Sequence, residues 1–502
     1  MSLTQVDRNV FRGGFPVEEG ALGGILARFV PRRVVGHPTF QNADNIGAEL
    51  RRGMEAALAA YPDDRIAFVV SDGTLTLDRP DVSTVEAALS AACDYLRSAP
   101  ASARERLLVA ATPYDGYKGD RTPGKGSALK LIFDETAHCS SLQTLIILDG
   151  DLRNDFRPWF RTFAAVEARH RASAPERHFF ITARYARHFV DASLTRFIVG
   201  PLTTLMGCYV PGGISGDIVL SAGAVRHERE AVWDDARRRY GTDIATTFDN
   251  IADPETDIYE VYLGAKLHDI TDEAKLSVMP GEVIGSALGR LLHYEDQDGR
   301  ITRLLGSDEP LKRPKTWGPD KTGIAFIDPG STDVFDVDRK RETLLSGFSR
   351  YEAAMRESLD PETFEAVRHG LERLHSAPTD DESPLVFLDI TRDFWIRILY
   401  ESLAHLLATR RLEAVKNCLT YLYTAAFLEF CREKLHRLGA RTYGAVRAVQ
   451  KRLGVPPEQA EAFYRNEVDA VVDAMAVAFY AGRRAILERL TARTSAFQSP
   501  PR

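Results

Sequence analysis

Short apolar runs alternate with amphipathic helical patterns along the first part of the chain. Runs at 32–40, 65–70 and 107–111 are rich in Val, Ala, Leu and Ile and end in polar or glycine-containing turns, which is typical of buried strands. Between these runs, apolar residues recur at helical spacing over 46–61 and 83–97. Strands and helices in alternation predict a mostly parallel, Rossmann-like sheet with covering helices and right-handed crossovers.

The alternation continues to about residue 290 and then changes. Further strands are predicted at 141–148, 179–184 and 258–263. Residues 291–335 are rich in Gly, Pro and charged side chains, which predicts an irregular connector.

The rest of the chain is predicted to be helical. Trp395 begins an apolar stripe at helical spacing, which we expect to face a core rather than a ligand and which continues with Ile398, Leu399, Leu403 and Leu406. Four segments are therefore expected: an irregular N-terminal arm (1–30), an α/β domain (31–290), the connector (291–335) and an all-α C-terminal domain (336–502).

Composition narrows the class of protein. The chain has 502 residues, which is too many for one compact core, and its hydrophobic content of 44% is ordinary for a soluble protein. A net charge of −7 argues against nonspecific nucleic-acid binding. The five cysteines lack CxxC or zinc spacing, which indicates a reducing compartment. We find no signal-peptide pattern and no apolar stretch long enough to span a membrane, so we expect a cytoplasmic protein.

Two carboxylates follow the apolar run at 141–148. In Asp149-Gly150-Asp151 the two aspartates are two residues apart, so in extended chain they face the same side. Carboxylates at the carboxyl end of a strand suit a divalent ion that is also bound by substrate phosphates. Gly150 is expected to let a ligand approach the backbone. The alternative is a solvated turn.

A glycine-rich basic segment precedes this motif. Gly119 and Gly124-Lys125 have the spacing of a phosphate-binding P-loop, but Gly126 stands where that motif needs Ser or Thr, and no strand leads directly into the loop. We therefore reject a P-loop. A basic, glycine-rich start of a helix still favours a nearby anion or nucleotide, although Lys125 alone could be a solvated charge.

In this order the motifs resemble those of the retaining nucleotide-sugar glycosyltransferases of the GT-A fold, in particular mannosylglycerate synthases and glucosyl-3-phosphoglycerate synthases. The resemblance spans roughly residues 32–290 and extends more weakly into the helical region. It implies a GT-A catalytic domain that moves glucose or mannose from a UDP- or GDP-hexose to a small hydroxy acid such as glycerate. It also implies Mg²⁺ or Mn²⁺ as cofactor, and we expect a homo-oligomer.

The resemblance also implies roles for individual residues. The nucleotide sugar would be held by Pro38, Thr39, Asp72, Lys125 and Asp149. The metal would be bound by Asp151, which is also assigned to catalysis, and by His268. The acceptor would be bound by Arg184, Arg187, Thr195, Gly216 and Asp217, with Asp243 as a catalytic carboxylate beside it. Carboxylate and imidazole ligands together suit Mn²⁺ and tolerate Mg²⁺.

Several of these residues have simpler explanations. His268 could be a surface or capping histidine, and Asp243 could be a helix N-cap ahead of Ile244. Arg184, Arg187 and His188 could form a solvated basic turn. Gly36-His37 stands before Pro38 where the related enzymes have apolar residues.

Other functions are also open. The same fold could act on a lipid, a polyol or a polysaccharide, or it could be a non-catalytic scaffold. The Gln-x-x-Arg-Trp motif of processive synthases is absent, and His37-Pro38-Thr39 differs from the Gly-x-Gly-Thr-Arg signature of sugar nucleotidyltransferases.

Overall fold

The computed structural model describes residues 3–15, 18–76, 79–114, 124–186, 189–190, 192–268, 273–318, 336–437, 439–453 and 467–498. The chain forms two compact units. The first contains Met1–Tyr185, Gly212–Asp269 and Pro314–Gly323, and the second contains Ala186–Pro211, Ile270–Arg313 and Ile324–Arg502. The units therefore interleave along the chain, whereas the segments expected from the sequence were continuous.

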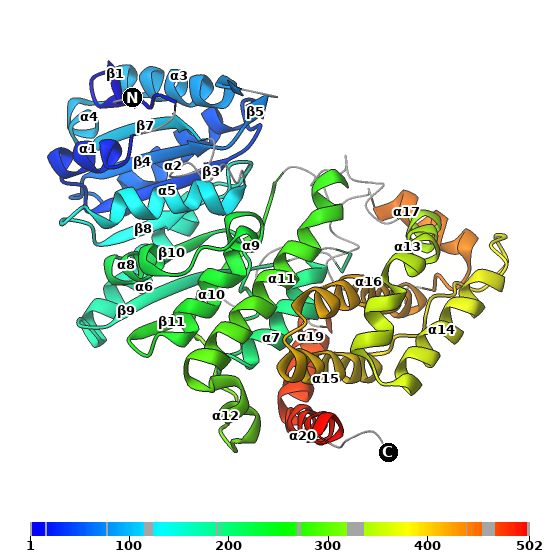
Figure 1. Cartoon of the computed structure of the whole chain (residues 1–502). Helices are drawn as coiled ribbons and strands as arrows, with labels where there is room; N and C mark the ends of the chain where they lie inside the picture. Colours follow the sequence, from blue (N-terminus) through cyan, green and yellow to red (C-terminus); the bar gives the residue numbers. More distant parts are fainter. Residues whose placement is uncertain are drawn as a thin grey trace. The chain divides into compact units, whose positions relative to one another are not determined.

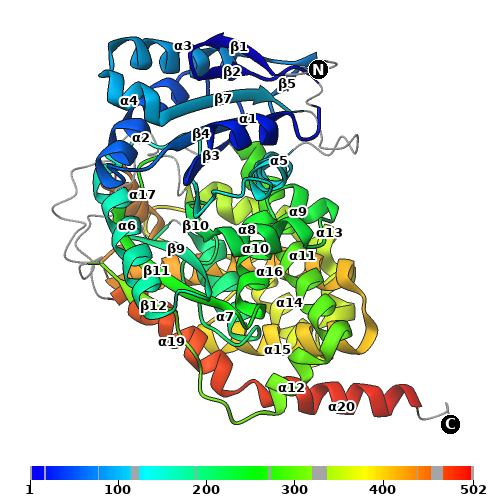
Figure 2. The same cartoon turned by 90° about the vertical axis from the view of Figure 1, so that its left-hand side faces the viewer.

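A ten-stranded sheet forms the first unit (Figures 1 and 2), in the spatial order β1-β2-β7-β4-β3-β8-β10-β9-β11-β12. Its strands are β1 (Thr4–Asp7), β2 (Val10–Arg12), β3 (Arg33–Thr39), β4 (Ile66–Asp72), β7 (Leu107–Pro113), β8 (Thr144–Ile147), β9 (His178–Ala186), β10 (Ile218–Ser221), β11 (Thr256–Ala265) and β12 (Lys315–Trp317). A separate short hairpin pairs β5 (Leu75–Thr76) with β6 (Arg79–Pro80).

The sheet is mostly parallel. β2, β7, β4, β3 and β8 run parallel to one another, as do β11 and β12, whereas β1 runs antiparallel to β2 and β10 runs antiparallel to both β8 and β9. The prediction of an α/β fold with a mostly parallel sheet is therefore confirmed. The helices of this unit are α1 (Ala21–Phe29), α2 (Ile46–Ala60), α3 (Ser83–Ser98), α4 (Ala101–Arg106), α5 (Lys125–Ala137), α6 (Arg157–Ser173), α8 (Ala222–Glu230), α9 (Asp235–Arg238) and α10 (Thr242–Ala252).

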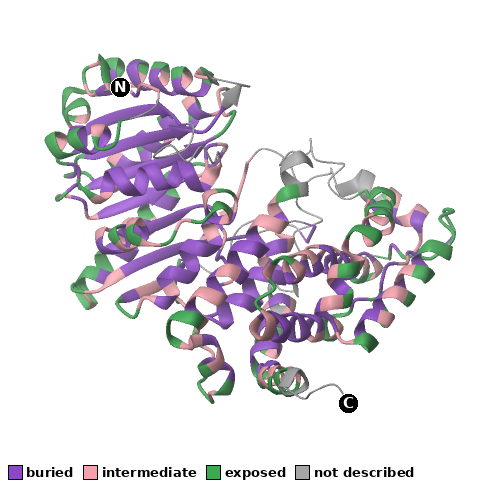
Figure 3. Ribbon diagram, in the orientation of Figure 1, coloured by how far each residue is buried: buried purple, intermediate pink, exposed green. Residues whose placement is uncertain are grey.

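Helices cover both faces of the sheet, and the central strands are buried along their whole length (Figure 3). On β4, Ile66, Phe68 and Val70 join the core beneath α2, α3 and α6, while Ala67 and Val69 join the core beneath α1, α5 and α8. Side chains alternate between the two faces of a strand, so a strand buried on both sides has to be apolar throughout. This is why the runs were recognisable in the sequence.

Two segments differ from the prediction. The arm at 1–30, expected to be irregular, contains β1, β2 and α1, and β2 extends the sheet by pairing with β7. Strands of three or four residues are too short to show a period. The expected irregular connector is wrong for 291–306, because α11 continues to Asp298 and α12 spans Arg300–Gly306. In segment 291–306 the buried apolar residues, among them Leu291, Ile301 and Leu305, recur at helical spacing, although the residues between them are largely charged or polar.

The named elements of the second unit are helical in the part of the chain that the structure describes. They are the π-helix η2 (Thr195–Val199), α7 (Gly200–Thr204), α11 (Glu273–Asp298), α12 (Arg300–Gly306), α13 (Val337–Ser358), α14 (Pro361–Ser376), α15 (Arg392–Thr409), α16 (Leu412–Arg437), α17 (Tyr443–Leu453), α19 (Glu467–Ala481) and α20 (Arg484–Gln498). The Trp395 stripe is core, as predicted: Trp395 is fully buried and its indole N–H donates to the Phe197 carbonyl at 3.0 Å.

Two further observations bear on the chain's environment. All five cysteines are buried free thiols. Across the described ranges, no helix is long and apolar enough to cross a membrane.

The order of strands contains one reversal that matters for function. From β3 the chain proceeds outward to β4 and β7, and it then returns to place β8 on the opposite side of β3. The loops that leave β3 and β8 diverge at such a reversal, and ligands of open α/β sheets bind there, outside the carboxyl ends of the strands. Thr39 ends β3, and Asp149 follows two residues after the end of β8.

Candidate active site

Thr39 and Asp72 meet at the carboxyl ends of β3 and β4. The Thr39 hydroxyl donates to Asp72 Oδ1 at 2.8 Å, and the Thr74 hydroxyl donates to the same oxygen at 3.1 Å. Asp72 is fully buried. Burial raises the pKa of Asp72 to about 6, although the hydrogen bonds from Thr39 and Thr74 act in the opposite direction. The two predicted donor-binding residues are thus neighbours, and the Asp72 carboxylate is bonded within the protein.

Gly150 lies against this loop. A Cβ at Gly150 would stand 2.6 Å from Thr39 Cγ2 and 3.3 Å from the Pro38 carbonyl oxygen. The space beside Gly150, which was expected to admit a ligand, is therefore occupied by Pro38 and Thr39. The glycine allows the loops after β3 and β8 to approach each other.

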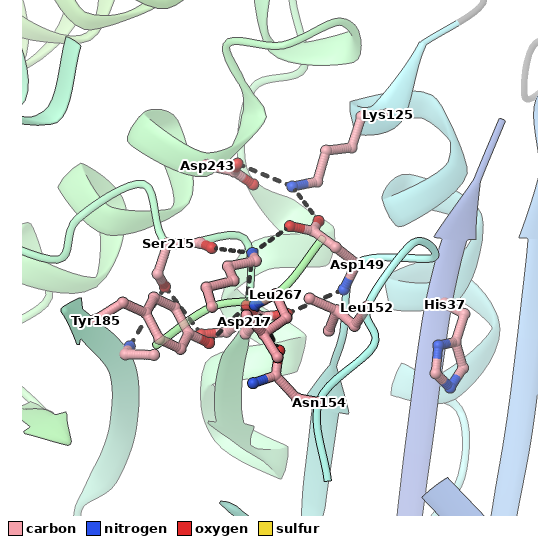
Figure 4. A network of polar contacts seen from close by, with 12 residues as sticks. His37, Lys125, Asp149, Leu152, Asn154, Tyr185, Ser215, Asp217, Asp243 and Leu267 are labelled. Carbon is pink, nitrogen blue, oxygen red and sulfur yellow. Dashed lines mark hydrogen bonds and ion pairs between the residues drawn. The ribbon is translucent and has the colours of Figure 1, made fainter. Parts of the chain in front are cut away.

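Lys266 belongs to a network of two lysines and three aspartates, of which Lys125 and the three aspartates are labelled in Figure 4. Its ammonium is 2.6 Å from Asp149 Oδ2, 2.7 Å from Asp217 Oδ2 and 2.7 Å from the Ser215 carbonyl oxygen. Three acceptors match the three N–H donors of an ammonium group, and the side chain is only 4% exposed. Lys266 therefore ties together the chain segments after β8, before β10 and after β11.

Lys125 forms the outer part of the network. It is the first residue of α5, and its ammonium is 2.8 Å from Asp149 Oδ1 and 2.9 Å from Asp243 Oδ2. The Lys125, Asp149 and Asp243 side chains are 17%, 23% and 17% exposed, so this end of the network reaches solvent. Asp243 lies in the first turn of α10, whose N-cap is Gly241. The alternative that Asp243 is the N-cap is therefore wrong.

Burial and the lysines act in opposite directions on the pKa values of Asp149 and Asp243. Burial raises the pKa of Asp149, but the ammonium groups of Lys125 and Lys266 outweigh it and hold the pKa well below its usual range. Burial raises the pKa of Asp243, which contacts only one of these lysines, and Lys125 offsets part of that rise. Burial lowers the pKa of Lys125, but the carboxylates of Asp149 and Asp243 outweigh burial and hold that pKa above its usual range. At neutral pH both Asp149 and Lys125 are charged.

Gly216 and Asp217 act on Asp149. Asp217 is fully buried; its Oδ1 accepts the Asp149 N–H at 3.0 Å and its Oδ2 accepts the Tyr185 hydroxyl at 2.6 Å. Gly216 has φ +81°, and a Cβ there would overlap the Asp149 carboxylate. Both residues were predicted to bind the acceptor. The structure places them behind Asp149, where they fix its backbone and leave room for its side chain.

Gly124 and Gly126 bring Lys125 into place. A Cβ on Gly124 would stand 2.6 Å from the Arg238 carbonyl oxygen, and one on Gly126 would overlap the Arg237 carbonyl. The Gly126 N–H donates to the Arg239 carbonyl at 3.1 Å. The sequence led us to expect an anion or nucleotide near this glycine-rich start of a helix; in the structure the two glycines pack the start of α5 against the backbone of 237–239.

Asp151 and His268 lie on neighbouring segments. Leu152 and His268 form an isolated antiparallel bridge, and the Arg153 N–H donates to the Leu267 carbonyl at 2.8 Å. Asn154 Oδ1 accepts the Leu267 N–H at 2.8 Å. Among the described residues, no group of three or more His, Cys, Asp or Glu could hold a metal ion. One carboxylate and one imidazole on paired segments fit a divalent ion that takes its remaining ligands from substrate and water.

The structure describes only some of the other residues that were predicted to bind the acceptor. Arg184, on β9, is buried and lies 3.5 Å from Glu260 Oε1, so it is not part of a solvated turn. Thr195 begins η2, in the second unit. Arg187 and His188 lie outside the described residues.

Two residues that sequence reasoning missed hold the loop after β8. Glu49 Oε2 accepts the Leu152 N–H at 3.0 Å. Arg52 donates to the Leu152 carbonyl at 2.6 Å and to the Asn154 carbonyl at 3.0 Å. Both lie on α2, three residues apart and so on one face of the helix. The sequence feature that could have identified them is Glu49, a charged residue at a position of α2 where the helical pattern calls for an apolar one.

Comparisons with known proteins give only distant likenesses. No protein-family model and no curated protein sequence matches the chain. Among solved structures, glucosyl-3-phosphoglycerate synthase from Mycobacterium tuberculosis in complex with phosphoglyceric acid is 17% identical, with a TM-score of 0.35, and the match covers 56% of this chain and 87% of that one. The same enzyme with Mn²⁺, uridine diphosphate and phosphoglyceric acid is 18% identical, with a TM-score of 0.35 and coverages of 56% and 85%. Likeness at this level identifies neither the family nor the activity of this chain.

Gly216→Ala should destabilise the protein more than another substitution at a positive-φ glycine. An added methyl group would be strained at φ +81° and would overlap the Asp149 carboxylate. We expect a loss of ~2–3 kcal/mol in the free energy of unfolding by urea denaturation. The matched control is Gly264→Ala, since Gly264 has φ +77° with open space around its Cβ position. Equal losses in the two variants would contradict this account of Gly216.

Asp72→Asn should remove the loss of folding stability that accompanies ionisation of the buried Asp72 carboxyl group as pH rises. Because burial raises the folded-state pKa of Asp72 from 3.8 to about 6, the folded state binds more protons between these values and stability falls as pH rises through that window. Relative to wild type, the variant should therefore gain up to about 3 kcal/mol in unfolding free energy between pH 4 and pH 7.5. Urea unfolding of both proteins across this range measures the gain. A stability difference that is independent of pH would contradict the raised pKa.

Proposed function

We propose that this chain is a metal-dependent glycosyltransferase of the GT-A fold. It moves glucose or mannose from a nucleoside-diphosphate sugar to a small hydroxy acid such as glycerate, with retention of configuration. The observation that carries the proposal is the meeting of two loops at the strand reversal. There the Asp149-Gly150-Asp151 loop after β8 packs on Pro38-Thr39 and pairs with the segment that carries His268. Nucleotides bind at such reversals, and a carboxylate with an imidazole suits the ion that accompanies a diphosphate.

Asp151 and His268 would hold the divalent ion, Mg²⁺ or Mn²⁺. When bound, the ion would stabilise as a Lewis acid the charge that develops on the leaving diphosphate. Asp149 has a different role, because each of its oxygens already faces a lysine. It orients Lys125, whose partly exposed ammonium would face the diphosphate oxygens and add positive charge there.

The donor's base and ribose would lie against Pro38 and Thr39. Asp72 supports this wall through its hydrogen bond to Thr39. Asp243, at the solvent-facing end of the network, is the carboxylate we assign to the acceptor side. Arg187 would bind the acceptor's carboxylate, because a guanidinium can donate two parallel hydrogen bonds to it. Arg184 and Thr195 are proposed as further acceptor contacts.

Asp151→Ala and His268→Ala should each abolish most of the transfer while the protein stays folded. Loss of a group that stabilises developing charge lowers turnover by ~100-fold or more. Turnover with a nucleotide sugar is measured beside circular dichroism. The control is Asp155→Ala, which removes a nearby surface carboxylate paired with Arg157. Wild-type turnover of either site variant, or of wild type in excess EDTA, would contradict the metal assignment.

Transfer should retain the anomeric configuration of the donor. A screen of UDP- and GDP-hexoses against glycerate, phosphoglycerate, polyols and lipid acceptors identifies the substrate pair, and NMR of the fresh product gives its configuration. An α-linked donor should give an α-linked product; a β-linked product would contradict the retaining assignment. Failure of every donor to react or hydrolyse would favour a scaffold over an enzyme.

A further inference from the structure

A buried polar pair lies beneath the loop after β8. His37, in β3, and Glu49, in α2, are both fully buried, and His37 Nδ1 is 2.9 Å from Glu49 Oε1. The other carboxyl oxygen of Glu49 accepts the Leu152 N–H at 3.0 Å. The His37 Nε2 atom has no hydrogen-bond partner within the described part of the chain. Buried polar groups are unfavourable unless they are bonded, so a buried pair between β3 and α2 that leaves one nitrogen without a hydrogen bond requires an explanation.

The His37–Glu49 pair is connected to the proposed metal ligand Asp151 through the backbone of Leu152. Leu152 follows Asp151 in the chain and is bridged to His268. Glu49 holds the N–H of Leu152, and Arg52, from the next turn of α2, holds its carbonyl at 2.6 Å. With both its N–H and its carbonyl bonded to the same helix, Leu152 cannot rotate freely. These bonds also restrain the backbone of Asp151, which shares a peptide plane with Leu152.

Both members of the pair favour the uncharged form. Burial lowers the pKa of His37 to about 3, against an opposing effect of the Asp149 carboxylate. Burial also raises the pKa of Glu49 well above its usual range, and the carboxylates of Asp151, Asp217 and Asp149 raise it further, against an opposing effect of the Leu152 N–H. In that form the Glu49 hydroxyl donates to His37 Nδ1 while its other oxygen accepts from Leu152. A neutral group in this place adds no charge to a site that already carries these aspartates.

We propose that His37 and Glu49 are positioning residues that fix the Asp151 carboxylate through the Leu152 peptide. Figure 4 shows His37 and Leu152 beside the lysine–aspartate network. This inference rests on the proposed function, because it takes Asp151 as a metal ligand. Groups that orient a metal ligand from behind it influence metal affinity although they do not touch the ion.

The test compares Mn²⁺ binding in three variants. Glu49→Leu removes the bond to Leu152 and should raise the Mn²⁺ dissociation constant roughly 10- to 100-fold, as loss of an outer-shell partner does. Glu49→Gln should stay close to wild type, because its amide can donate to His37 and its carbonyl can accept from Leu152. The control is Glu167→Leu, another buried glutamate of this unit, whose partners include Tyr61 and Thr144 and which should leave Mn²⁺ binding unchanged.

Mn²⁺ binding is followed by the electron paramagnetic resonance of the free ion, and hydrogen exchange is measured on the peptide spanning 149–154. Faster exchange in Glu49→Leu but not in Glu49→Gln supports the proposal. Wild-type affinity of folded Glu49→Leu, or equal weakening by Glu167→Leu, overturns it. If Glu49→Leu does not fold, His37→Leu replaces it, with weaker Mn²⁺ binding and faster exchange expected, and wild-type values overturn the proposal. If wild type itself does not bind Mn²⁺, the metal assignment fails, and the exchange measurement alone then decides whether the pair positions the loop.

Discussion

The site depends on one carboxylate held between two ammonium groups. Asp149 contacts Lys125 with one oxygen and Lys266 with the other, at 2.8 and 2.6 Å. Through these contacts the start of α5 and the segment after β11 are joined to the loop after β8. Removing one partner from a buried ion pair leaves an uncompensated charge, which is strongly destabilising. The geometry of the loop therefore depends on Lys125 and Lys266 remaining in place.

The lysine–aspartate network has an excess of negative charge, and its two lysines differ in exposure to solvent. Asp149, Asp217 and Asp243 carry three negative charges against the two positive charges of Lys125 and Lys266, so its formal net charge is −1 when all five are ionised. The Lys266 ammonium is buried and has an acceptor for each of its N–H groups, whereas Lys125 is partly exposed to solvent. A residual negative charge beside Asp151 suits a cation, while an exposed ammonium suits the phosphates that such a cation accompanies.

Close backbone approach is the second requirement of the site. Gly150, Gly216 and Gly126 each stand where a Cβ would meet another part of the chain: the loop after β3, the Asp149 carboxylate and the backbone near α9. These glycines are used for packing between protein segments. The chemistry of the site is left to the charged side chains that the packing brings together.

The sequence alone determined the central strands of the sheet and most of the helices that cover it, but not β1, β2, α1 or α12. Each central strand is buried on both faces, so it appears as a continuous apolar run, and its ends at Thr39, Asp72 and Ile147 could be located to within a few residues. The sequence also singled out Lys125, Asp149, Asp243 and His268 as residues of interest. The roles taken from the resemblance, which concern metal, acceptor and donor, remain proposals.

Only the tertiary structure decided which residues meet. Lys125 and Asp243 are 118 residues apart, and Glu49 and Leu152 are 103 residues apart. No local pattern encodes such a contact, because it follows from strand order and from how closely the loops pack. The contacts of Asp217 and Gly216 with Asp149 are likewise visible only in the tertiary structure, whereas their assignment to the acceptor came from the resemblance and stays a prediction. Spacing along the chain specifies which side of a strand or helix a residue faces, whereas its partner is fixed by the fold.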